Sequence, residues 1–151
     1  MDIGYKLLQT KEKGEGILAT KKFFKGDTVM IGTIEADNIE SNHSHASQMG
    51  KNRFAVHGGY ITKVNHSCNP NCGIKLNDQN AHDFIAIRTI EMGDEITFDY
   101  AMRNYCIEYF PDQCCCGADK CRGQITGWKD LPNDIRLKYK GFVAPYLLEL
   151  D

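Results

Sequence analysis

Two dense polar motifs decide the fold predicted for this chain: Asn-His-Ser-Cys-Asn-Pro-Asn at residues 65–71 and Gly-Asp-Glu-Ile-Thr-Phe-Asp-Tyr at residues 93–100. Pro70 fixes its own backbone φ and disfavours helix at the residue before it, so the first motif predicts a rigid irregular loop. The second motif begins with a turn and continues with β-branched and aromatic residues, which favour a half-buried strand. The pair predicts a loop that can hold a polar ligand and a strand that delivers the Tyr100 phenol to a sheet edge.

The length and composition of the chain predict a single domain. With 151 residues, of which 42% are hydrophobic, the chain is expected to bury about 70% of the surface that its unfolded form exposes. It has no apolar run near ~20 residues to span a bilayer, and its first residues lack the layout of a signal peptide. We therefore expect an intracellular protein, in the cytoplasm or in the nucleus on chromatin, with no membrane partner.

The charge balance bears on the class of partner. The formal net charge is −2 and the isoelectric point is about 6.2, whereas binding nucleic acid through the overall field needs clustered Lys and Arg. Direct nucleic-acid binding is therefore not expected. Mild acidity is compatible with a basic protein or peptide partner, and the oligomeric state stays open.

Residue patterns outside the two motifs predict a mainly β fold with short helices. Apolar residues on both sides of a glycine turn indicate two strands within residues 3–20, and the polar stretch 33–53 is expected to be a solvated loop. Pro132 and Gly141 are typical of the start and the end of a short helix. The other expected strands cover residues 28–31, 54–56, 72–76, 84–90 and 96–100, and the expected helices cover residues 131–139 and 144–150.

Two local patterns admit a second interpretation. Residues 14–19 satisfy the dinucleotide-binding pattern G-x-G-x-x-A, but no buried strand precedes them and no crossover helix follows, so this interpretation is disfavoured. His43 and His45 would lie on one face of an extended segment and could bind a metal ion. No further ligand stands at matching spacing, and a solvated loop is the favoured interpretation.

Together, the two polar motifs closely resemble the signature of SET-domain protein lysine methyltransferases, in the same order and at about the same separation. The resemblance extends to Lys-Gly-Glu-Gly-Ile at residues 13–17 and to the cysteine-rich residues 114–123. It implies an S-adenosyl-L-methionine-dependent enzyme that methylates the side-chain amine of lysine in a basic protein substrate, such as a histone tail.

The resemblance also implies the architecture. Family folds of this kind are small twisted β-sheets of the β-clip type, in which the C-terminal segment passes beneath a preceding loop as a pseudoknot. We expect a SET domain over residues 1–112 and a zinc-binding post-SET segment over residues 113–126. A C-terminal helical extension over residues 127–151 is expected to pack on the same domain.

The glycine segment is expected to contact the cofactor. In the family, glycines here bring the backbone close to S-adenosylmethionine, which a β-carbon would obstruct. The family often has an aromatic residue at the position of Glu15, so a stacking contact with the cofactor is expected to be missing. The matching residues are Lys13, Gly14, Glu15 and Gly16.

Four residues of the two polar motifs match functional positions of the family. Asn65 and His66 resemble the residues that hold the amino acid and adenine portions of the cofactor, although such side chains can instead satisfy their own loop. Tyr100 matches the catalytic tyrosine, whose hydroxyl sits where methyl donor and amine meet. Phe98 stands where the family carries Phe or Tyr, and Phe leaves room for di- or trimethylation.

The cysteine content indicates a metal site. Seven cysteines in a chain expected to be intracellular fit metal binding better than complete disulfide pairing. Cys114, Cys116 and Cys121 form C-x-C-x₄-C, a spacing that can wrap one tetrahedral zinc but leaves one position to fill. Cys68 is the expected fourth ligand, and Cys72 is the alternative.

The resembling post-SET arrangement implies a structural role for this zinc, which pins the C-terminal tail over the cofactor and completes the lysine channel. Cys115 is expected to face away from the metal by alternation. Cys72 and Cys106 are otherwise most simply core thiols.

Two functions of other classes remain open at this point. A catalytically silent, zinc-stabilised peptide-binding module would share the fold, but the presence of Tyr100, Asn65 and His66 argues against it. A cysteine-rich redox or metal-handling protein would have reactive thiols at residues 114–116 and disulfides in place of one tightly held zinc.

Overall fold

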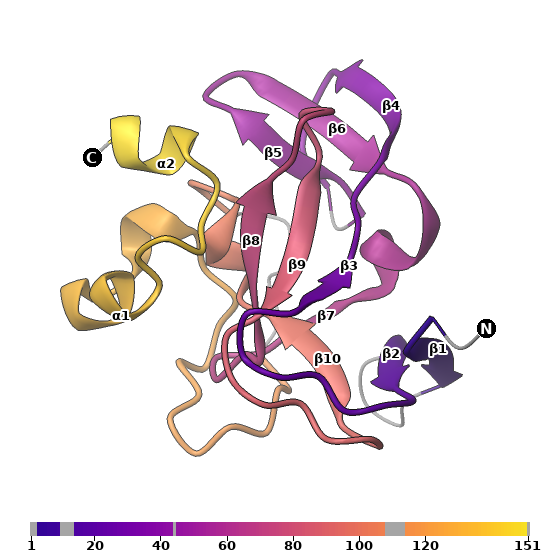
Figure 1. Cartoon of the computed structure of the whole chain (residues 1–151). Helices are drawn as coiled ribbons and strands as arrows, with labels where there is room; N and C mark the ends of the chain where they lie inside the picture. Colours follow the sequence, from indigo (N-terminus) through magenta and orange to yellow (C-terminus); the bar gives the residue numbers. More distant parts are fainter. Residues whose placement is uncertain (1–2, 10–13, 44, 108–113, 151) are drawn as a thin grey trace.

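The computed structural model describes residues 3–9, 14–43, 45–107 and 114–150. Within these ranges the chain is mainly β with short helices, and three small sheets surround one hydrophobic core (Figure 1). This confirms the predicted fold class. The threaded C-terminal segment that the resemblance implies stays a prediction.

The first sheet joins the two polar motifs. Its strands, in spatial order, are β1 (Tyr5–Gln9), β2 (Glu15–Ala19), β10 (Glu95–Phe98) and β7 (Asn65–His66). β7 and β10 run parallel, with Asn65 opposite Thr97 and His66 opposite Phe98. The start of the first motif therefore lies in a sheet and not in an irregular loop, because its backbone pairs with the late strand.

The second sheet contributes apolar side chains to the hydrophobic core. Its strands, in spatial order, are β3 (Thr28–Met30), β9 (His82–Ala86) and β8 (Cys72–Leu76). Phe84 and Ile74 are fully buried, as expected for apolar positions on a core-facing strand. The strand predicted at residues 84–90 begins earlier, at His82, and ends at Ala86.

The third sheet shows that the loop predicted for residues 33–53 is wrong. Its strands, in spatial order, are β4 (Ile34–Ile39), β6 (Arg53–His57) and β5 (Ser47–Gly50). β4 is an edge strand with many exposed side chains, and buried Gln48 on β5 is satisfied by the Tyr105 N–H at 2.9 Å. Polar residues therefore build strands here without apolar alternation. His43 and His45 do lie exposed between β4 and β5, as predicted.

The C-terminal region packs on the same core. The Ile74 N–H bonds the Phe142 carbonyl and the Ala144 N–H bonds the Met102 carbonyl, both at 2.8 Å. Trp128 is buried in the shared core. The helical segments are η1 (Gly59–Lys63), η2 (Tyr100–Met102), η3 (Trp128–Asp130), α1 (Asn133–Lys138) and α2 (Tyr146–Glu149). Both α-helices are shorter than predicted.

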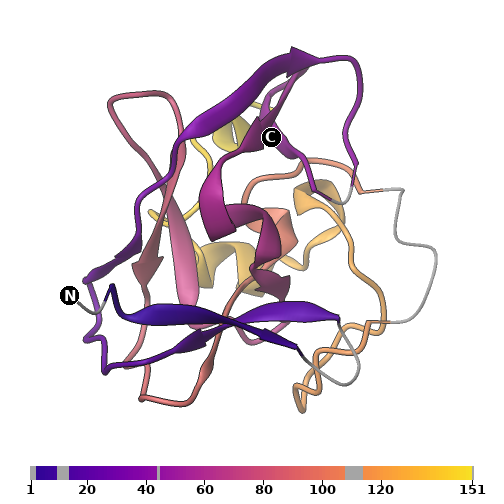
Figure 2. The same cartoon turned by 90° about the vertical axis from the view of Figure 1, so that its right-hand side faces the viewer.

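The two views show how these parts surround the centre. α1 and α2 lie on the opposite side of the molecule from β1 and β2 (Figure 1). Turned by 90°, η1 lies between the β1–β2 ribbon and the third sheet, and it contacts both β2 and β6 (Figure 2). Among the residues described, no helix has both the length and the apolar character needed to cross a membrane.

Candidate active site

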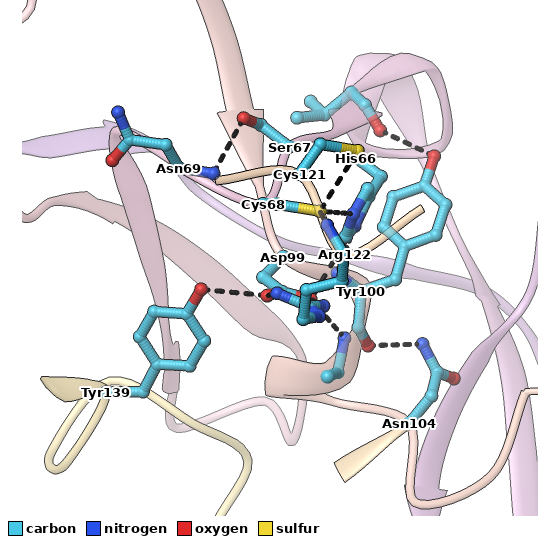
Figure 3. Close-up of polar contacts among 12 residues, drawn as sticks. His66, Ser67, Cys68, Asn69, Asp99, Tyr100, Asn104, Cys121, Arg122 and Tyr139 are labelled. Atoms are coloured by element: carbon cyan, nitrogen blue, oxygen red, sulfur yellow. Dashed lines mark hydrogen bonds and ion pairs between the residues drawn. The ribbon is translucent and has the colours of Figure 1, made fainter. Parts of the chain in front are cut away.

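Tyr100 is the first residue of η2, separated from the end of β10 by Asp99, and does not lie inside the strand as predicted. Its hydroxyl donates to the Val64 carbonyl at 3.2 Å, and its N–H donates to His66 Nδ1 at 3.1 Å. The side-chain amide of Asn104 donates to the Tyr100 carbonyl at 2.8 Å (Figure 3). The turn after β10 thus aims the phenol at the segment that precedes the first polar motif.

Phe98 forms an apolar wall beside this phenol. It is fully buried, and its ring centroid lies 4.9 Å from that of Tyr100 and 4.8 Å from that of Phe84. The Arg103 guanidinium carbon lies 4.7 Å from the Phe98 ring centroid, a cation–π arrangement. Packing from several sides therefore fixes the Phe98 ring.

Asn65 connects the two motifs to the glycine segment. Its side-chain amide lies 2.9 Å from both the Glu15 carbonyl and a Glu95 carboxylate oxygen, and donates to each. Lys63 forms an ion pair with the Glu15 carboxylate at 2.8 Å. These contacts bring the predicted cofactor residues Glu15 and Asn65 together, and Lys63 was not identified from the sequence.

The remaining predicted cofactor residues are Gly14, Gly16 and Lys13, and the structure describes the two glycines. Gly14 has φ +71°, and a β-carbon built on it would have no neighbour within 4 Å. Glycine is thus favoured here by the backbone conformation, and the space beside it leaves room for a bound molecule. Gly16 pairs with Leu8 in the β1–β2 ladder. Lys13 lies outside the described residues.

His66 links Tyr100 to the cysteine cluster. Its Nδ1 accepts the Tyr100 N–H, so the neutral ring carries its proton on Nε2, which lies 3.3 Å from Cys68 Sγ. In this tautomer the 3.6 Å approach of Nδ1 to Asp99 is no ion pair. The ring of buried His66 lies edge-on to that of Tyr100, with centroids 5.2 Å apart.

The four predicted zinc ligands converge. The Sγ atoms of Cys68, Cys114, Cys116 and Cys121 all lie within 4.8 Å of one another. Tetrahedral zinc with Zn–S bonds of about 2.3 Å places its sulfurs ~3.8 Å apart, and Cys68 and Cys121 are 4.0 Å apart. The donor set and its spacing therefore fit zinc. Cys72 lies buried on β8, Cys115 is exposed, and Cys106 is only partly buried, not the core thiol predicted.

The surroundings of these thiols favour thiolate at some positions. Burial raises the pKa of Cys116, but hydrogen bonds from the N–H groups of Cys68 and Ala118 and from the Cys121 and Cys114 side chains together outweigh this effect and lower it to about 7. Burial raises the pKa of Cys68 to about 11, although the Arg122 N–H donates to its sulfur at 3.4 Å. A bound metal ion deprotonates its thiol ligands, so these N–H groups would then bond thiolate sulfur.

Comparison with known proteins identifies the fold family. Residues 14–101 match the family model of the SET domain. The chain belongs to the SET-domain family. The match includes the glycine segment from Gly14 onward and both polar motifs with Cys68, and it ends before Cys114 and the C-terminal helices.

Several histone-lysine N-methyltransferases are similar in sequence. Set2 of Drosophila melanogaster is 29% identical over 144 residues, 83% of this chain and 6% of that protein. An H3 lysine-36 specific enzyme of Chaetomium globosum is 32% identical over 140 residues, 80% of this chain and 15% of its own length. ATXR3 of Arabidopsis thaliana is 42% identical over 81 residues, 48% of this chain and 4% of ATXR3. The chain thus spans only a small part of each relative.

Solved structures share the fold at lower identity. KRYPTONITE, crystallised with mCHH DNA, an H3(1-15) peptide and SAH, superposes with a TM-score of 0.62 at 20% identity, over 80% of this chain and 29% of that one. The Plasmodium falciparum protein PFL0690c superposes with a TM-score of 0.56 at 20% identity, over 65% of this chain and 93% of that one. Both comparisons concern the fold alone.

A buried ionic network under the SET-domain site was not predicted from the sequence. The Asp99 carboxylate is fully buried, and Arg122 contacts it at 2.7 and 2.9 Å. The Tyr139 hydroxyl donates to the same carboxylate at 2.8 Å (Figure 3). The tyrosine and the arginine come from segments far along the chain, so a motif search has no local signal that pairs them with Asp99.

A pocket of about 470 Å³ opens beside Cys68. Pro70 and Arg88 line it together with Lys120 of the cysteine-rich segment and Lys138 of α1. Asn65, His66 and Tyr100 are not among its lining residues. The pocket therefore adjoins the second half of the first polar motif, but it does not include the predicted cofactor residues Asn65 and His66 or Tyr100.

Proposed function

We propose that this SET-domain chain is an S-adenosylmethionine-dependent protein lysine methyltransferase. The observation that carries the proposal is the convergence of the Tyr100 phenol, the Asn65–His66 strand and the four thiols around one short parallel strand pair. The histone-lysine methyltransferase names of its relatives support the same activity.

Tyr100 and Phe98 suit the chemistry of methyl transfer to an amine. A lysine amine has a reference pKa of about 10.4 and must be uncharged to attack, so the site must align it and accept its hydrogen bonds. Because the Tyr100 hydroxyl donates its proton to Val64, its oxygen is oriented to act as an acceptor toward the amine. The Phe98 ring adds an apolar wall without a hydroxyl, which leaves room for di- or trimethylation.

The cosubstrate supplies the methyl group as a sulfonium carbon, and alignment alone can contribute ~7–11 kcal/mol to such an in-line step. The cosubstrate would be held by the glycine segment and by β7. Asn65 bonds the Glu15 carbonyl and pairs with β10, the strand that leads to Tyr100. The residues concerned are Gly14, Glu15, Gly16, Asn65 and His66. Lys13 is included by its match to the family motif. The Lys63 side chain, paired with Glu15, would lie at the same rim.

Zinc would have a structural function. Cys68 belongs to the first polar motif, whereas Cys114, Cys116 and Cys121 belong to the C-terminal side. An ion held by all four would tie the cysteine-rich segment to the first polar motif, just after β7 and His66. We assign residues 1–112 to the SET domain, residues 113–126 to the post-SET segment and residues 127–151 to a helical extension.

The proposed substrate is a basic protein segment, with a histone tail as the first candidate. The relatives are named for histone lysine, and one structural neighbour was crystallised with an H3 peptide. The mildly acidic chain, with net charge −2, is compatible with such a partner. A histone substrate would place the chain on chromatin.

The experiment compares wild type with Tyr100→Phe, using labelled S-adenosylmethionine and a panel of histone and other basic proteins. Wild type should label a lysine, and the variant should lose at least about 10²-fold in turnover, because amine alignment fails, while cosubstrate binding persists in calorimetry. Equal labelling by the two proteins would remove Tyr100 from the mechanism. Cosubstrate binding without transfer by wild type to any protein of the panel would favour a silent binding module.

A further inference from the structure

We propose that Tyr139, acting through Asp99, is a positioning residue for Tyr100. The C-terminal segment 128–147 would then take part in the active site and not only in the core. This inference rests on the proposed methyltransferase function, and Tyr139 lies outside the part of the chain that the SET-domain model matches.

Asp99 controls the backbone that carries Tyr100. It immediately precedes Tyr100, its side chain is 0% exposed, and one carboxylate oxygen accepts the Ala101 N–H at 3.0 Å. This bond caps η2, the turn that begins with Tyr100. A rotation of the Asp99 carboxylate would therefore shift the turn from which the phenol projects.

Tyr139 fixes one side of that carboxylate. It is 5% exposed at the end of α1, and its hydroxyl donates to Asp99 Oδ2 at 2.8 Å (Figure 3). Burial, with the neighbouring Asp99, raises the pKa of Tyr139. The phenol consequently stays protonated and remains a hydrogen-bond donor at neutral pH.

Arg122 fixes the other side. Its Nη2 donates to Asp99 Oδ1 at 2.9 Å, and its Nη1 lies 2.7 Å from Oδ2. A buried carboxylate needs a paired charge as well as hydrogen bonds, and the arginine supplies that charge. Loss of the Tyr139 hydroxyl would therefore leave the Asp99 charge compensated by Arg122 but its carboxylate less firmly oriented. Such a variant should fold and yet position Tyr100 less accurately.

The test uses Tyr139→Phe, which removes one oxygen atom, in the full chain with zinc. We expect kcat to fall roughly tenfold or more, since small misplacements of reacting groups cost about this much. The KM for a histone H3 peptide and the Kd for S-adenosylmethionine should stay within about twofold. Without any substrate, the Ala101 amide resonance should shift in a ¹⁵N–¹H spectrum, because its acceptor moves.

Two further variants keep the inference falsifiable. Arg136→Gln is the matched control, because Arg136 lies on α1, which ends just before Tyr139, and its side chain bonds the Trp128 carbonyl at 2.8 Å instead of Asp99. The Arg136→Gln variant should lower the melting temperature of the protein without lowering kcat. Arg122→Lys keeps the positive charge but loses the two-nitrogen contact, and should lower kcat as Tyr139→Phe does.

The outcomes separate the two proposals. An active wild type with unchanged kcat in both Tyr139→Phe and Arg122→Lys overturns the inference and leaves the proposed function intact. An equal loss of kcat in Arg136→Gln would also overturn it, because general destabilisation would then explain the effect. A wild type that transfers no methyl group contradicts the proposed function itself.

Discussion

Three consecutive residues, Phe98, Asp99 and Tyr100, have separate functions in the proposed site. Phe98 packs between aromatic rings, Asp99 accepts hydrogen bonds beneath the turn, and Tyr100 presents its hydroxyl next to the Val64 carbonyl. The alternation of a strand followed by a tight turn sends these side chains in different directions. One short segment thus combines an apolar wall, an internal anchor and a reactive group.

Phe98→Tyr should narrow the range of products. An added hydroxyl beside the Tyr100 ring, whose centroid is 4.9 Å away, would occupy space needed by a methylated amine and bind a water there. Mass spectrometry of a lysine peptide should show di- or trimethyl product for wild type and mainly monomethyl product for the variant. The same product distribution from both proteins would refute the steric assignment of Phe98.

Residue patterns located the proposed cofactor and catalytic residues but not the residues that support them. Asn65, His66 and Tyr100 were predicted because each stands in a dense local motif. Arg122 and Tyr139 were not, because their importance depends on reaching Asp99 over 23 and 40 positions of sequence. Contacts of this length are properties of the folded chain.

At the scale of elements, apolar patterning predicted the strands that face the core and missed those that do not. β8 and β9 carry buried apolar residues and were expected. β4 was missed because many of its side chains are exposed. β5 was missed because its buried polar side chains, Ser47 and Gln48, are satisfied by partners elsewhere: Ser47 bonds His57 at 2.9 Å. Hydrogen bonding can place polar residues in a sheet without an alternating signal.

Gly73 on β8 packs so closely against the C-terminal segment that a larger side chain should destabilise the protein. A β-carbon on Gly73 would lie 2.4 Å from Phe142 Cβ and 3.0 Å from Ile87 Cγ2. Gly73→Ala should therefore cost about 1–3 kcal/mol of unfolding free energy in urea titrations.

Gly50→Ala on β5 is the control for this change. Its new β-carbon would have its nearest neighbour, Arg53 Cβ, at an ordinary 3.7 Å, so the unfolding free energy should change by no more than about 0.5 kcal/mol. Equal unfolding free energies of the two variants would show that Gly73 does not pack as closely against Phe142 as the structure indicates.

The cysteine-rich element should depend on one zinc ion. Cys116→Ser removes one of four converging thiols, so elemental analysis should find far less than one zinc per chain, with a lower melting temperature. Cys115→Ser changes an exposed neighbour outside the cluster and should retain the metal. Full zinc retention in Cys116→Ser would disprove the ligand assignment.

On the scale of the whole molecule, a buried histidine pair connects the second and third sheets. His57 on β6 and His82 on β9 stack with ring centroids 5.3 Å apart, and the His82 N–H donates to His57 Nε2 at 2.9 Å. Burial, with the nearby Arg103 guanidinium, lowers the pKa of His57 to about 3 and that of His82 well below its ordinary value. Both rings are therefore neutral in the folded protein.

Stability should consequently fall in mild acid. The unfolded chain takes up protons on both histidines near pH 6.5 and the folded chain does not, so the unfolding free energy decreases as pH drops from about 6.5 toward 3. Each histidine contributes up to about 1.4 kcal/mol per pH unit. Between about pH 6.5 and 5 most carboxylates remain ionised, which isolates the effect of the histidines.

Denaturant titrations at several pH values measure this slope. A double variant with His43→Gln and His45→Gln serves as the control, because both side chains are exposed and should contribute little to the slope. A flat stability profile between pH 6.5 and 5 would contradict neutral burial of His57 and His82.

The central claim is that the glycine segment, the Asn65–His66 strand and Tyr100 form one cosubstrate site next to a four-cysteine zinc. A crystal structure of the chain with zinc and S-adenosylhomocysteine tests it most directly. We predict the thioether sulfur next to the Tyr100 hydroxyl, with zinc bonded to Cys68 and its three partners. Binding of S-adenosylhomocysteine in the pocket beside Pro70 and Arg88, away from Tyr100, would contradict it.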